Sequence, residues 1–143
     1  MTTRVAWQNL AEDRILDAKA HLVAGVERWS AAYYLVGYAV ECGLKSCVLA
    51  LVVTHPEVIF EDRYFSKSAW THDLESLLVV AHLKVERDAD ALANGVLYTN
   101  WQRVKEWNEK SRYEQKNQIE AQRLFDAITD PTDGVMQWIR VRW

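Results

Sequence analysis

Four residues that carry polar chemistry lie on one face of a predicted helix. Tyr34, Tyr38, Glu41 and Lys45 follow one another at spacings of four, three and four residues, as one face of a helix requires. A glutamate four residues ahead of a lysine is the order of an ordinary surface pair, worth roughly a few tenths of a kcal/mol. On a buried face, each charge would instead need partners from other helices, because a buried unpaired charge is costly. We expect the buried arrangement, since the flanking residues are almost all apolar.

Two further segments carry candidate ligand-binding residues. His72 precedes Asp73 at the expected start of a helix, where it is either a proton carrier or a neighbour of the cap. Arg112 and Tyr113 fall between two predicted helices, and a guanidinium beside an aromatic ring suits an anion or a base. An ion pair of Arg112 with Glu114 or Glu41 is the alternative. The candidate cluster therefore comprises Glu41, Lys45, His72, Arg112 and Tyr113, and no residue is assigned a catalytic role.

The sequence predicts neither a metal site nor a cofactor. The four histidines form no pair at the spacing of helical metal ligands, and neither cysteine falls near one in a zinc pattern. Glycine-rich phosphate loops and the serine nucleophile elbow are also absent from the sequence. Cys42 and Cys47 are five residues apart in a helical pattern, which turns them away from each other. We expect them to be buried thiols in a reducing compartment.

Composition indicates one globular domain that spans residues 1–143. Half of the residues are hydrophobic and 26% are charged, which is the balance of a folded protein. The formal net charge of -3 argues against binding duplex nucleic acid by bulk electrostatics. The first residues do not resemble a signal peptide, and no apolar run reaches the roughly 18 residues of a membrane span. We therefore expect a soluble, cytoplasmic protein without a membrane partner.

The elements that must position these residues are predicted to be helices. With two prolines and five glycines, the chain has few of the turns that a many-stranded fold requires. A first helix is expected over residues 8–24, closed by Gly25. A second is expected over residues 29–53, and it is apolar on nearly all faces, as is typical of a central helix. The fold class is therefore all-α, with about five to six helices around this long apolar one.

Helix boundaries in the second half are predicted from capping residues and apolar spacing. A loop should extend to about Trp70, and Thr71 should cap a third helix. A fourth helix is expected over residues 88–110, opened by Asp88, and a fifth over residues 114–129. Asp130 and Pro131 have the features of a helix start, which predicts a last short helix.

Several segments resemble one family. Residues 32–45, AYYLVGYAVECGLK, resemble the central helix of HEPN domains, in the stand-alone group whose helix reads close to YYLAGYAVECALK. The run from Thr71 to Leu74 is similar to that group's histidine-led third helix. The run from Trp107 to Tyr113 is similar to its tryptophan followed by Ser-Arg-Tyr, and residues 125–139 are similar to its closing region. The resemblance spans nearly the whole chain.

The resemblance implies an up-and-down helical bundle, commonly a homodimer, often with a nucleotidyltransferase partner in toxin–antitoxin or defence systems. Many members are metal-independent ribonucleases that use an arginine followed, after four to six residues, by a histidine. Arg112 is followed by no histidine, and the spacing from Arg63 to His72 is two residues too long. Arg14 and His21 satisfy the spacing, but they lie in the first helix, whereas the family's motif lies late in the chain.

Two functions follow from these observations. The first is a dimeric HEPN-like binding module that takes a partner protein, a nucleotide or RNA at the candidate cluster. The alternative is a metal-independent endoribonuclease toxin, in which His72 acts as general base and Arg112 stabilises the phosphorane. Seven tryptophans and six tyrosines also favour a homodimer, because they exceed what the core of so short a chain easily hides.

Overall fold

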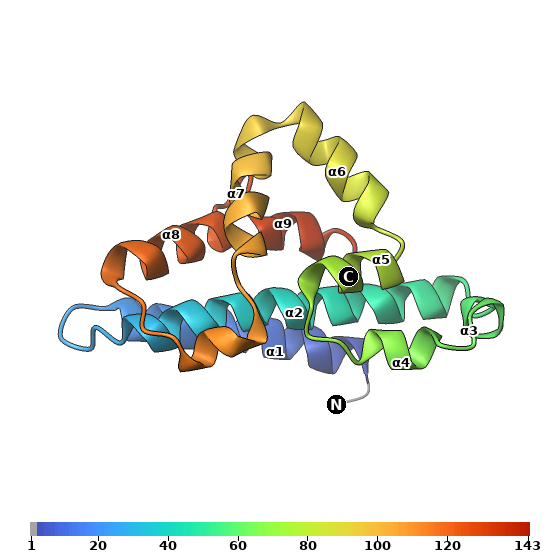
Figure 1. Ribbon diagram of the computed structural model, residues 1–143, viewed down its shortest axis with the longest axis horizontal. Coiled ribbons are helices and arrows are strands. Elements are labelled where there is room, and N and C mark those ends of the chain that lie inside the picture. The colour runs from blue at the N-terminus through green and yellow to red at the C-terminus, as the bar shows by residue number, and fades with distance from the viewer. Residues whose placement is uncertain (1–2) are drawn as a thin grey trace.

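The computed structural model describes residues 3–143, and within them the protein is helical without a strand (Figure 1). The all-α prediction is confirmed, but the expected number of five to six helices is too low, because several are very short. The elements are α1 (Arg4–Leu22), α2 (Trp29–Thr54), α3 (Val58–Glu61), α4 (Phe65–Ala69), α5 (Leu74–Val80), α6 (Lys84–Ala93), α7 (Gly95–Lys105), the 3-10 helix η1 (Glu109–Tyr113), α8 (Gln118–Thr129) and α9 (Val135–Arg140).

The long helix α2 forms the centre of the protein, as its apolar sequence predicts. It pairs along its length with α1, and it also contacts α5, α8, α9 and η1 (Figure 1). Thirteen of its 26 residues are buried. Its close wrapping by other helices explains why nearly every face of α2 is apolar.

By length and composition alone, α2 could cross a membrane. Its most apolar 18-residue window has a mean hydropathy of 1.7, although Glu41 and Lys45 interrupt the apolar run. However, 61% of that window is buried within the protein. This burial is compatible with the core helix of a soluble protein, because such a helix can be as long and as apolar as a membrane span.

The first helix is longer at its start than predicted and ends earlier. Thr3 caps α1 by accepting a hydrogen bond from the amide of Ala6 at 3.1 Å, so the helix begins at Arg4 and not near residue 8. It ends at Leu22, and the chain then turns through Gly25, whose φ of 88° suits a residue without a side chain.

The predicted loop before Trp70 contains two short helices, α3 and α4. Both are shorter than isolated peptides can sustain, so packing against the rest of the protein must stabilise them. The prediction that Thr71 caps the next helix is wrong. Asp73 caps α5 by accepting from the amide of Ser76 at 2.9 Å, whereas Thr71 accepts from the amide of Asp73. The cap therefore lies two residues later than predicted.

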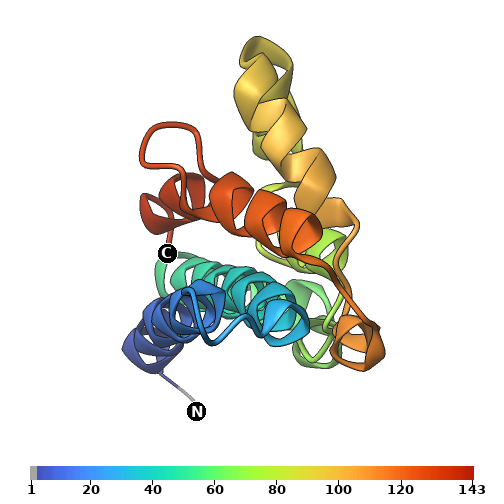
Figure 2. The ribbon, with the colours of Figure 1, turned by 90° about the vertical axis from the view of Figure 1, so that its left-hand side faces the viewer.

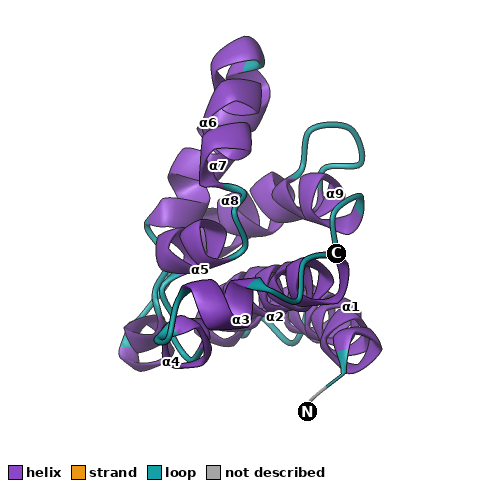
Figure 3. Cartoon of the chain, turned by 90° about the vertical axis from the view of Figure 1, so that its right-hand side faces the viewer, coloured by secondary structure: helices purple, strands orange, loops and turns teal. Residues whose placement is uncertain are grey.

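The expected helix over residues 88–110 is divided into two. Asn94 ends α6 and caps α7, since its side chain accepts from the amides of Val96 and Leu97. Asp88 therefore lies within α6 and does not open a helix. The hairpin of α6 and α7 projects away from the pair of α1 and α2 (Figures 2 and 3).

The last two helices begin later than predicted. Asn117 caps α8 by accepting from the amide of Glu120 at 2.9 Å, so the helix begins at Gln118 rather than near residue 114. Asp130 accepts from the amides of Thr132 and Asp133, which closes a turn and not the first turn of a helix. The short α9 then starts at Val135.

Candidate functional site

Glu41 is a buried carboxylate in the middle of α2. Its side chain is 1% exposed, and Nζ of Lys45 donates to Oε1 at 2.8 Å. Lys45 is itself 13% exposed and lies 5.0 Å from the centre of the Trp7 ring on α1. The buried interpretation of this pair is therefore confirmed for Glu41, and the surface-pair alternative is wrong.

His72 supplies the second partner of the buried carboxylate. Nδ1 of His72 lies 2.8 Å from Oε1 of Glu41, across 31 positions of sequence. Because a carboxylate can only accept, this hydrogen bond requires a proton on Nδ1. Nε2 on the opposite side of the ring lies 3.4 Å from Oε2 of Glu109 in η1. His72 therefore connects the buried carboxylate of Glu41 to Glu109 at the surface. It is more than a residue that happens to precede the helix cap Asp73.

Local turn chemistry positions the imidazole. Thr71 accepts from the amide of Asp73, and Asp73 caps α5. These side-chain bonds fix the backbone just before α5, where the chain passes along α2. The ring of His72 is 51% exposed, so one edge faces Glu41 and the other faces solvent and Glu109.

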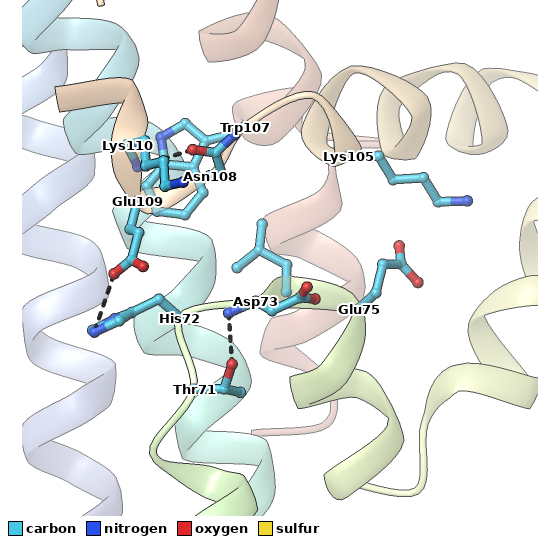
Figure 4. Close-up of a pocket in the computed structure, with 10 residues that line it drawn as sticks. Thr71, His72, Asp73, Glu75, Lys105, Trp107, Asn108, Glu109 and Lys110 are labelled. Atoms are coloured by element: carbon cyan, nitrogen blue, oxygen red, sulfur yellow. Dashed lines mark hydrogen bonds and ion pairs between the residues drawn. The ribbon is translucent and has the colours of Figure 1, made fainter. Parts of the chain in front are cut away.

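A pocket of about 430 Å³ opens beside His72 (Figure 4). We call it the His72 pocket. Residues around the start of α5 form one wall, and the end of α7 with the start of η1 forms the other. Its lining mixes three carboxylates with two lysines and the imidazole. The lining residues are Thr71, His72, Asp73, Leu74, Glu75, Lys105, Trp107, Asn108, Glu109 and Lys110.

Trp107 joins the His72 pocket to the central helix. The indole is 3% exposed and stacks on Tyr34 with ring centres 5.9 Å apart. Tyr34 stacks in turn on Tyr38 at 6.1 Å. A Cβ at position 37 would overlap the indole, so this close approach requires Gly37. Tyr34, itself stacked on Tyr38, therefore provides the surface of α2 on which Trp107 packs.

The aromatic and thiol groups around Glu41 stay uncharged at neutral pH. Burial, reinforced by the nearby Cys42 and Glu41, raises the pKa of Tyr38 to about 12. Burial also raises the pKa of Cys42 and of Cys47 to about 12. Both cysteines are buried and unbridged, as predicted. A thiol with such a pKa is a poor nucleophile, so these groups fill space.

Arg112 and Tyr113 lie on η1 but do not line the His72 pocket. Both side chains are exposed, and the guanidinium carbon lies 4.8 Å from the centre of the Tyr113 ring. Tyr113 holds the pKa of Arg112 above its usual value, with a smaller contribution from Tyr34. Within residues 3–143 Arg112 forms no ion pair with Glu114 or Glu41. The structure thus brings together Glu41, Lys45 and His72, and leaves Arg112 and Tyr113 nearby on the surface.

The ribonuclease alternative requires His72 and Arg112 to act on one phosphate. Across the described part of the chain, no hydrogen bond or ion pair joins the two side chains. The imidazole instead faces Glu41 and Glu109. This alternative stays a prediction without a supporting contact.

A buried arginine that the sequence did not reveal stands behind the His72 pocket. Arg87 is 1% exposed, binds both carboxylate oxygens of Glu75, and donates from Nε to Asp88 at 2.8 Å. Its guanidinium also lies 4.8 Å from the centre of the Trp101 ring. Burial alone would raise the pKa of Glu75, but hydrogen bonds from Arg87 and Lys84 outweigh it and lower that pKa. Glu75 is therefore held ionised at the pocket wall, with its charge paired to Arg87 and Lys84.

No signal in the sequence pointed to Arg87. Its partner Glu75 is twelve residues away in another helix, a distance that no helical periodicity links. Its neighbour Asp88 was taken as a helix start, which would place Arg87 before the helix and in solvent.

Within residues 3–143, no group of three or more histidine, cysteine or acidic residues has the geometry to hold a metal ion. Comparison of the sequence and the fold with known protein families, curated proteins and solved structures finds no match. The chemistry of the site is that of a buried carboxylate held by the ammonium group of Lys45 and by the imidazole of His72, which opens onto a pocket of mixed charge.

Proposed function

We propose that this protein is a HEPN-like helical binding module, a dimeric component of a nucleotidyltransferase-linked toxin–antitoxin or defence system. It binds a partner at the His72 pocket. The observation that carries the proposal is Glu41, a carboxylate that is 1% exposed in the most apolar helix of the protein. The resemblance of residues 32–45 to the HEPN central helix supports the choice of family.

A buried carboxylate in this position is poorly explained by stability alone. Hydrophobic residues of similar volume often replace a buried ion pair without loss, and sometimes with gain. Residues retained against stability are those that function demands. Glu41 orients His72 through the 2.8 Å hydrogen bond, and His72 forms part of the pocket wall. The carboxylate therefore sets the direction of a ligand-binding side chain.

The charges of the His72 pocket favour a polypeptide ligand over a polyanion. Asp73 and Glu109 offset Lys105 and Lys110, and Glu75 is paired with Arg87 and Lys84, so the lining has no excess of positive charge. Phosphate-rich ligands are normally held by a clear excess of lysine and arginine. A partner protein with its own mixed charges can pair with both signs. We therefore propose a partner protein, of the nucleotidyltransferase type, as the first occupant and RNA or a nucleotide as the second.

Replacing His72 with alanine is expected to weaken binding of the proposed nucleotidyltransferase-type partner by about tenfold or more, as for a contact residue that becomes buried in the complex. The melting temperature should also fall, because Glu41 is 1% exposed and loses the hydrogen bond from Nδ1, so circular dichroism must show that the variant is still folded. Calorimetric titration of the two purified proteins measures the affinity. His55→Ala is the matched control, since His55 is an exposed histidine that also faces a glutamate, Glu57, at 3.4 Å.

The same variants separate the two functions. Equal affinity in wild type and His72→Ala would contradict the proposed binding site. Structured and unstructured RNA should remain intact in EDTA. Cleavage that is lost in both His72→Ala and Arg112→Ala, with folding preserved, would instead support the metal-independent ribonuclease.

We further propose a homodimer, formed through the apolar surface around α3, α4 and α5. Phe60 and Trp70 are 91% and 81% exposed, and Tyr64 and Val79 are also exposed nearby. Trp70 contributes to the lining of two neighbouring pockets. The one that also includes Ile59 and Phe65 is lined mainly by apolar side chains. An exposed patch of this kind is typical of a protein–protein interface.

Light scattering at micromolar concentration should therefore give about twice the monomer mass of 16.6 kDa. Trp70→Ser should shift the population toward the monomer without lowering the melting temperature of the subunit, because the indole is exposed. A wild-type mass near 16.6 kDa would contradict the dimer.

A further inference from the structure

A second pocket, of about 330 Å³, lies where α2, α7 and α8 meet. It shares no lining residue with the His72 pocket. Tyr33 of α2 contributes to its lining, and the charged residues are Arg103, Glu106, Lys116, Glu120 and Arg123. We call it the Arg103 pocket. Three cations and two carboxylates give its lining a net positive charge.

The two arginines of this pocket are available to a ligand. Each has a carboxylate three positions away in the sequence: Glu106, at the end of α7, for Arg103, and Glu120, in α8, for Arg123. Nevertheless, within residues 3–143 neither guanidinium forms an ion pair or a side-chain hydrogen bond. The buried Arg87, by contrast, uses its guanidinium fully on Glu75 and Asp88. Two unpaired guanidinium groups from different helices therefore line one pocket.

Tyr33 adds a hydrogen-bond donor to the pocket. Its side chain is 5% exposed, and in the described chain its hydroxyl makes no hydrogen bond. Burial raises the pKa of Tyr33, so the hydroxyl keeps its proton at neutral pH. The hydroxyl oxygen is not fully enclosed, so it can donate a hydrogen bond to a ligand in the pocket.

Lys116 contributes positive charge and holds the tyrosine. Its ammonium lies 4.6 Å from the centre of the Tyr33 ring and pairs with Glu114 at 3.0 Å. A second carboxylate, Glu120, is 3.8 Å away. The amide of Lys116 also donates to the hydroxyl of Ser30 on α2 at 2.8 Å, which anchors this segment to the central helix.

We propose that the Arg103 pocket binds the phosphoryl group of a small, hydroxylated phosphomonoester. Arg103 and Arg123 bind the phosphoryl oxygens, Tyr33 donates to one of them, and Lys116 adds positive charge. Planar guanidinium groups match the oxygens of a phosphoryl group, which they bind through paired hydrogen bonds. Glu106 and Glu120 accept hydrogen bonds from ligand hydroxyls and repel a second anionic group, so a long polyanion is disfavoured. This site is independent of the proposed partner-binding function.

Ribose 5-phosphate tests the proposal, with ribose and sulfate as comparison ligands. Calorimetric titration should show saturable binding of ribose 5-phosphate, weaker binding of sulfate and none of ribose. The melting temperature should rise with ribose 5-phosphate concentration, which reports binding even when its heat is small.

Variants locate the binding. Arg103→Gln and Arg123→Gln should each weaken binding about tenfold, the loss expected for one charge-assisted hydrogen-bonding group. Tyr33→Phe should weaken it by about threefold to tenfold, as for a neutral hydrogen bond. Arg63→Gln and Tyr98→Phe are matched controls, because both residues are exposed and lie outside the pocket. Binding no tighter than that of sulfate, or unchanged in the Arg103→Gln, Arg123→Gln double variant, would overturn the proposal.

Discussion

Glu41→Gln is expected to lower the free energy of unfolding by about 3 kcal/mol. Removing one member of a buried ion pair typically costs about 3 to 5 kcal/mol, because the remaining charge loses its compensation. The lower end applies here, since His72 is 51% exposed and solvent can accept the hydrogen bond of Nδ1 once the carboxylate is gone. Lys45 is only 13% exposed and is the partner left most poorly compensated. Denaturant unfolding measures the change.

An exposed pair offers a matched control for this substitution. His55 and Glu57 are also a histidine and a glutamate in contact, but both are more than half exposed. Glu57→Gln should therefore change stability by less than about 1 kcal/mol. A similarly small change in Glu41→Gln would contradict the buried cluster.

A double-mutant cycle separates the contributions of the two partners. Glu41→Gln combined with His72→Ala should show coupling, because both side chains share the 2.8 Å contact. Replacing Glu41 and Lys45 together by methionine should recover most of the lost stability, since an apolar pair of similar size leaves no charge behind. If this apolar variant is as stable as wild type and no longer binds the partner protein, the cluster serves function and not folding.

Gly37→Ala is the second substitution with a large expected effect, a loss of about 2 kcal/mol in the free energy of unfolding. The new Cβ would overlap the Nε1, Cδ1 and Cε2 atoms of Trp107. The indole is 3% exposed and packed on Tyr34, so it cannot rotate away without a wider rearrangement. Overpacking of this kind costs about 1 to 3 kcal/mol. It outweighs the gain of up to about 1 kcal/mol that alanine offers over glycine in a helix.

Gly95→Ala is the control for Gly37→Ala. A Cβ at Gly95 would meet no atom within 4 Å, and the backbone there has no positive φ. This variant should be neutral or stabilised by up to about 1 kcal/mol. Because Trp107 also lines the His72 pocket, Gly37→Ala should in addition change near-ultraviolet circular dichroism and weaken partner binding. Equal stability of the two glycine variants would show that Trp107 adjusts freely.

The sequence alone determined the central helix and the pair that it carries. The apolar residues of α2 follow helical spacing over the whole segment and cover nearly every face, which requires burial whatever surrounds the helix. The four-residue spacing of Glu41 and Lys45 likewise requires the two side chains to meet on that helix. Both conclusions depend only on helix geometry, so no tertiary information was needed.

Helix boundaries were predicted less well, because several side chains compete to cap each end. Thr71 and Asp73 are both good caps, and only the packing of α5 against α2 places the helix start after Asp73. Asn94 was overlooked as a cap because the apolar spacing continues across it, although its side chain satisfies two amides of α7. The short helices α3 and α4 are too brief to form without tertiary contacts.

Only the tertiary structure decided which distant residues join Glu41. His72 meets it across 31 residues, whereas Arg112, an equally plausible partner from sequence, stays on the surface. The approach of Trp107 to Gly37 and the burial of Arg87 on Glu75 are also contacts between separate helices. Helical periodicity gives each helix a buried face but not the rotation and offset of its neighbours. Those depend on side-chain packing at every crossing, and that packing is what places His72, and not Arg112, beside the buried carboxylate.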